Sequence, residues 1–173
     1  MEVNSMETEA IRQYLGILKD AFSQRASAAD VLDSEEGPVL ICTVASPFDE
    51  NDEIAYQVSL HSADEGFVAT EIMIFMFTDI SEDKFRDLSL LINRLNQFIS
   101  LGSFRLYEDN GTVMLYQGMI FDEAMQTAKV TELIFATIQS LESAMTGLGG
   151  FIDRALKGEN MDLILADLHK EAE

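Results

Sequence analysis

The chain has 173 residues, 47% of them hydrophobic, and its 11 Lys and Arg residues against 31 Asp and Glu residues give a formal net charge of −20. This size and apolar content indicate one globular domain with a substantial core and exclude bulk disorder. The charge argues against nucleic-acid binding, which needs a basic stripe to neutralise phosphates. Two interpretations of the acidity stay open: colloidal solubility alone, or a partner with basic segments.

The N-terminal segment, the short apolar runs and the single cysteine predict a cytoplasmic protein. The segment MEVNSMETEA lacks the basic and apolar regions of a signal peptide. The densest apolar run, residues 72–77, is too short to span a bilayer. Cys42 has no second cysteine to pair with, and its apolar neighbours predict a buried strand thiol.

A helix and three strands are predicted first along the chain. Asn4 and Glu7 fit a capping box, and apolar residues at helical spacing predict a helix from about residue 5 to about residue 26. The segment 33–38 (DSEEGP) breaks that pattern. Strands are then predicted at residues 38–45, 54–60 and 67–77, and the short acidic loops between them predict a meander.

A second helix and a hairpin follow. Ser81, with two acidic residues directly after it, is expected to cap a helix that ends at Gly102. Two apolar strands flank Asn110-Gly111, a pair that supplies the positive φ angles of a tight hairpin turn. The hairpin is therefore the most specific local prediction.

Asp122 is expected to cap a third helix that stops at Gly147 or at Gly149-Gly150. A last short helix would follow a turn at Gly158. The element order α-β-β-β-α-β-β-α predicts an α+β fold. We divide the chain into a single domain at residues 1–149 and a helical tail at residues 150–173.

No catalytic or metal-binding motif is recognisable. His61, expected in a turn, and His169, expected in the tail, lack partners at metal-ligand spacing, which indicates surface histidines. An EF-hand loop starting at Asp49 would need Gly and Glu where Ile54 and Leu60 stand, which leaves only weak adventitious cation binding. We predict a protein that is not an enzyme and needs no cofactor or metal. An unfamiliar site with two carboxylates of raised pKa would be the alternative.

The apolar stripe of the second helix is a candidate interface. Helix stripes usually belong to the core, but this helix carries more apolar residues than one face needs. Some of them could therefore meet a second copy of the chain or a partner. The predicted face consists of Leu88, Leu91, Leu95 and Phe98.

The segment from the second helix to the third helix resembles the YbjN family, a bacterial family related in fold to type III secretion chaperones. The resemblance covers residues 85–145 and is only topological before them. It rests on a helix with an L-N-x-x-N-like segment, a glycine, a G-x-F-x-L strand and an acidic glycine turn. The matching residues are Leu91, Asn93, Leu95, Asn96, Gly102, Phe104, Leu106, Glu108, Asp109 and Gly111.

This resemblance implies a curved antiparallel sheet packed by helices, and a small cytoplasmic homodimer that binds protein. Secretion chaperones hold an extended effector segment against apolar patches on the sheet and first helix. We therefore expect a chaperone-like, non-enzymatic module that holds an apolar segment of a partner protein. The alternative is a regulatory domain of the sensory-transduction type that binds a small ligand or partner. Asn93 and Asn96 are its candidate contacts, unless they bond the helix to the sheet.

Overall fold

The computed structural model describes residues 5–62, 66–122 and 124–171. The predicted α+β class is confirmed: one six-stranded antiparallel sheet is packed by helices, with strand order β1-β2-β3-β4-β6-β5. The strands are β1 (Ala28–Ser34), β2 (Gly37–Ala45), β3 (Glu53–Ser62), β4 (Phe67–Phe77), β5 (Ser103–Tyr107) and β6 (Thr112–Asp122). The helices are α1 (Ser5–Phe22), α2 (Phe85–Leu95), α3 (Thr127–Leu156) and α4 (Met161–Glu171), with short 3₁₀ turns η1 (Glu82–Lys84) and η2 (Glu108–Asn110).

Strand β1 was not predicted. The first helix ends at Phe22, not near residue 26, and Ala28–Ser34 pairs antiparallel with β2, from Ala28 opposite Thr43 to Ser34 opposite Gly37. Two aspartates lower the strand propensity of this segment, so the sequence pattern did not indicate a strand there. They are tolerated because β1 lies at the sheet edge, where charged side chains also deter pairing with other chains.

The predicted hairpin is confirmed, with a different turn. Of its loop residues only Gly111 has a positive φ, at 58°, and it follows the 3₁₀ turn η2. A Cβ on Gly111 would lie 2.4 Å from the carbonyl oxygen of Ile80. The Ile80 N–H donates to the Gly111 carbonyl at 3.0 Å, so the glycine permits the hairpin to close against the segment before α2.

The predicted helix caps are only partly confirmed. The Asn4 capping box lies outside the described residues. Ser81 directly precedes η1 and makes no side-chain cap bond. The Asp122 carboxylate accepts the Ala124 N–H at 2.8 Å, but α3 begins only at Thr127. Asp122 therefore shapes the turn out of β6 and does not cap the helix.

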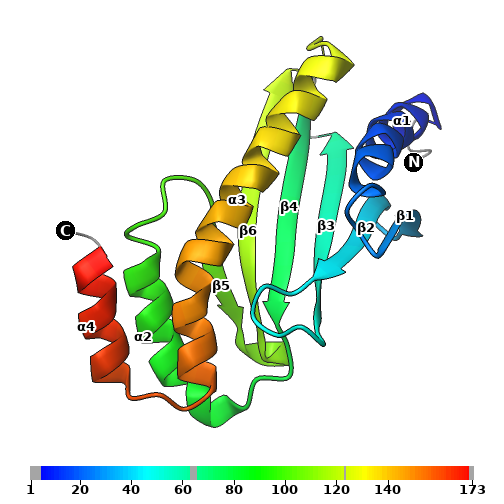
Figure 1. The fold of residues 1–173 in the computed structure, drawn as a ribbon. Coiled ribbons are helices and arrows are strands. Elements are labelled where there is room, and N and C mark those ends of the chain that lie inside the picture. Colours follow the sequence, from blue (N-terminus) through cyan, green and yellow to red (C-terminus); the bar gives the residue numbers. More distant parts are fainter. Residues whose placement is uncertain (1–4, 63–65, 123, 172–173) are drawn as a thin grey trace.

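All four helices contribute to one core on one face of the sheet. Helix α3 crosses in front of the sheet, with α2 and α4 beside its lower half and α1 at the upper right (Figure 1). It packs against each of these three helices. The strand residues they cover include the alternating set Ile54, Tyr56, Val58 and Leu60 that the sequence indicated, each at most 2% exposed. Cys42 is also buried there, as predicted.

The predicted boundary at residue 149 is wrong, because α3 continues through all three glycines to Leu156. Gly149 is buried, and a Cβ on it would lie 2.6 Å from Met76 Cε and 2.7 Å from Phe48 Cζ. The glycine therefore serves close packing between α3 and the sheet side of the core. In α4, Ile164 and Leu168 are 0% and 2% exposed and belong to the same core, so residues 150–173 are not a separate tail.

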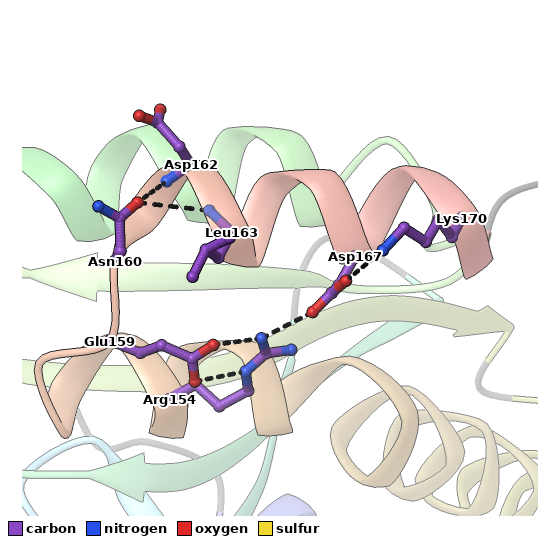
Figure 2. A network of polar contacts seen from close by, with 7 residues as sticks. All are labelled: Arg154, Glu159, Asn160, Asp162, Leu163, Asp167 and Lys170. Carbon is purple, nitrogen blue, oxygen red and sulfur yellow. Dashed lines mark hydrogen bonds and ion pairs between the residues drawn. The ribbon is translucent and has the colours of Figure 1, made fainter.

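Polar contacts fasten α4 to the end of α3 (Figure 2). The Arg154 guanidinium pairs with Glu159 and, at 2.8 Å, with Asp167, while Lys170 pairs with Asp167 at 2.8 Å. The bond from Arg154 lowers the pKa of Glu159, and those from Lys170 and then Arg154 lower the pKa of Asp167. The Asn160 side chain accepts the Asp162 N–H at 2.8 Å and starts the helix. This network has a structural role.

Candidate functional site

The predicted interface on α2 requires correction. Leu88, Leu91 and Leu95 are 1%, 0% and 0% exposed in the single chain, so they belong to its core and cannot contact a second folded copy. Phe98 alone of the predicted set is accessible, at 42%. The sequence could not separate the two roles, since core and interface stripes have the same helical spacing.

One uncovered surface is the side of the sheet that faces away from the helices. We call it the open face. Side chains of paired residues share a face, so the register assigns two neighbouring rows to it. One row contains Ile41, Gln57, Met73 and Tyr116, and the next contains Thr43, Ala55, Phe75 and Met114. None of these residues belongs to the core cluster that the helices cover, but Met114 is only 4% exposed and so adds little accessible surface.

By register, four of the eight large apolar side chains that remain exposed in the described chain lie on the open face, although Phe67, at the start of β4, also lines a cavity next to α1. Leu32 at the β1 edge is 45% exposed, and Phe67 and Ile120 near one end of β4 and β6 are 47% and 70% exposed. Tyr107 on β5 is 40% exposed. Exposed apolar side chains on an uncovered sheet face make that face a candidate interaction surface.

A short polar chain crosses the open face near β5. The Arg105 guanidinium lies 3.6 Å from the centre of the Tyr116 ring, and the Tyr116 hydroxyl donates to Glu71 Oε1 at 2.7 Å. The bond to Glu71, followed by burial, raises the pKa of Tyr116. The polar groups of Arg105, Tyr116 and Glu71 thus contact one another, and the apolar side chains around them are the part of the face available for binding.

A second apolar surface is the groove between α1 and α3, a hollow of about 690 Å³. Ile17 of α1, 42% exposed, lines it together with Phe135 of α3. Ala128 and Ala136 make its α3 side shallow enough for close approach of another chain. The sequence pointed to the first helix as a contact surface, but not to its pairing with α3.

A smaller cavity of about 200 Å³ lies between α1 and the ends of β3, β4 and β6. Its lining is mostly apolar, with Tyr14, Ser62 and Asp122 as polar groups. The ligand contacts suggested by the sequence are elsewhere. Asn93 is exposed, and Asn96 bonds α2 to β5, donating to the Phe104 carbonyl at 2.9 Å and accepting the Phe104 N–H at 2.8 Å. Its side chain thereby occupies main-chain groups at the β5 edge.

Sequence reasoning missed a half-buried polar network below α1. Glu142 Oε1 accepts the Tyr56 hydroxyl at 3.0 Å and pairs with Arg25 at 2.8 Å. Burial, followed by the Glu142 charge, raises the pKa of Tyr56, and burial raises that of the neighbouring Cys42 to about 11. Such a thiol is a weak nucleophile. The network joins the end of α1 to α3 and the sheet, and no sequence spacing connects residues so far apart.

The described residues contain no group of three or more His, Cys, Asp or Glu side chains placed to hold a metal. His61 lies half-buried near the end of β3, not in a turn, and His169 is exposed on α4. No helix in the described part of the chain is long and apolar enough to cross a membrane. No protein-family model and no curated protein matches the sequence.

Proposed function

We propose that this protein is a non-enzymatic, chaperone-like binding module of the bacterial cytoplasm that acts as a homodimer and holds an apolar segment of a partner protein. One observation carries the proposal: two separate surfaces with exposed apolar side chains, the open face and the α1–α3 groove, are left uncovered by a chain that already has a hydrophobic core. The YbjN resemblance of residues 85–145 supports the same function.

The partner segment is assigned to the α1–α3 groove. Ile17 and Phe135 provide apolar contacts from two different helices, and a groove between helices accepts the apolar side of an extended or helical segment. Gln13 and Gln139 also line it and can bond to a peptide backbone. The acidity of the chain favours segments that also carry basic residues.

The test is suppression of aggregation of reduced insulin B chain, a defined apolar probe. Wild-type protein should slow aggregation, and Ile17→Asp should reduce that effect at least about fivefold, which corresponds to about 1 kcal/mol of lost contact. Leu163→Asp is the matched control, because Leu163 is 60% exposed on α4, outside the groove. Equal activity of the two variants, or none in the wild type, would refute the proposal.

The small cavity supports a second candidate, a regulatory domain that binds a small apolar ligand. Its volume suits a ligand of about ten heavy atoms, and its few polar groups could orient a hydroxyl or amine. Thermal unfolding measured with small aromatic alcohols should then show a raised Tm. Val68→Phe, which fills the cavity, should remove the increase, and an increase that persists would place the ligand elsewhere.

A further inference from the structure

We infer that the occupant of the open face is a second copy of this chain, so that the homodimer is two sheets stacked face to face. The inference rests on the homodimer proposed above and names its interface, which is not α2. It leaves the α1–α3 groove of each copy free for the partner segment, because that groove lies on the helical side of the sheet.

The width of the apolar surface argues for a broad, flat occupant. Leu32 on β1 and Ile120 on β6 are separated by four strand steps, or about 19 Å at about 4.8 Å per step. A bound strand or helix lying along the sheet covers only about 5–10 Å of that width. Ser59 and Glu71 lie between the two residues, so an occupant that covers both must be as wide as another sheet, and this chain supplies one of matching size.

The area is also sufficient for a stable dimer. Six strands span about 24 Å, and the long central strands, at about 3.3 Å per residue, span about 33 Å. Their product, up to about 800 Å² per copy, equals the share that each partner contributes to a typical specific interface. Two aligned sheets pack in this way in β-sandwiches, with interdigitating side chains between them.

Charges at the two edges of the sheet do not select this arrangement. A two-fold axis parallel to the strands places β5 of one copy over β1 of the other. Arg105 on β5 already lies against the Tyr116 ring, and on β1 Asp30 pairs with Lys19 and Asp33 with Arg12 of α1, so these charges have partners within each chain. The two copies as a whole still repel each other, because each carries a net charge of −20.

This combination predicts how the dimer responds to salt. Repulsion between the two copies is screened as the Debye length falls from about 10 Å at about 0.1 M salt to about 3 Å at about 1 M, while apolar contact is not weakened. Dimerisation through the open face should therefore tighten with salt. An interface on the exposed side of α2 around Leu90 would also include Asp87 and Arg94, whose mutual attraction salt would screen, so the Leu90→Glu variant and not salt alone separates the two interfaces.

The experiment is light scattering coupled to size exclusion at several protein concentrations, at low and high salt. The wild type should have a mass near twice 19.3 kDa, with a larger dimer fraction at high salt. Ile120→Glu should raise the dimer dissociation constant at least about tenfold, because it buries a charge in the interface. Since Ile120 is 70% exposed in the single chain, this variant should fold. Leu90→Glu on α2, where Leu90 is 56% exposed, is the matched control and should remain dimeric.

Three results would overturn the inference: a monomer at all concentrations, a dimer weakened by salt, or a dimer disrupted by Leu90→Glu but not by Ile120→Glu. If the chain is a monomer and another protein covers its open face, the occupant of that face is that protein and not a second copy. The aggregation assay separates the two proposals. A monomer that protects the insulin chain through Ile17 overturns the dimer alone, and a dimer that fails to protect it overturns chaperone-like binding alone.

Discussion

Replacing Gly111 by alanine probes the contact that holds the β5–β6 hairpin against the rest of the domain. The substitution adds a single methyl group at a position with φ of 58°. The methyl carbon would lie 2.4 Å from the carbonyl oxygen and 2.9 Å from the amide nitrogen of Ile80. These are backbone atoms, so they cannot move aside as a flexible side chain would.

Two costs add up at this position. Holding a residue with a Cβ in the left-handed region costs about 1–2 kcal/mol. Displacing the Ile80 backbone adds about 1–3 kcal/mol, a typical price of overpacking, and weakens the bond from the Ile80 N–H to the Gly111 carbonyl. We therefore expect the free energy of unfolding to fall by about 2–5 kcal/mol. For a chain of this size, that lowers the Tm by about 4–20 °C.

Urea and thermal unfolding followed by circular dichroism measure this loss. Gly158→Ala is the matched control, because Gly158 has φ of 84° but no heavy atom lies within 4 Å of its added Cβ. It should cost only the conformational term, about 1–2 kcal/mol. If Gly111→Ala is no more destabilising than Gly158→Ala, the hairpin does not pack tightly on Ile80 and the reasoning fails.

Three further predictions concern the polar groups. Tyr56→Phe should lower the free energy of unfolding by about 1–2 kcal/mol in urea titrations, because Glu142 loses a hydrogen bond and keeps only Arg25; an unchanged midpoint would contradict this. Asp167→Asn should lower the Tm at pH 7, and the difference from the wild type should shrink as the pH falls below 3.8 through the lowered pKa, because a carboxylate with a lowered pKa stabilises the fold only while it is charged. A Tm difference that does not shrink at low pH would show that the Asp167 charge is not its cause. Cys42 should react with a disulfide reagent at pH 8 at least about 100-fold more slowly in the folded than in the urea-unfolded chain, because the thiol is buried and its pKa is about 11; comparable rates would refute its burial.

The sequence by itself determined the local elements. Alternation in residues 54–60 identified a strand with one buried face, and Asn110-Gly111 identified the hairpin, because strand pleat and turn geometry depend on neighbouring residues. The burial of Cys42 followed in the same way from its apolar neighbours. These predictions needed no knowledge of distant parts of the chain.

Only the tertiary structure decided which surfaces are free. The spacing of Leu88, Leu91 and Leu95 fits a core stripe and an interface equally well, and α3 together with β5 assigned them to the core. Gly149 resembled a helix stop, because local sequence does not show that Met76 and Phe48 approach the helix there. The open face depends on all helices packing on the same side of the sheet. Alternation shows which residues share a face, but the packing of segments distant in sequence decides which face is covered.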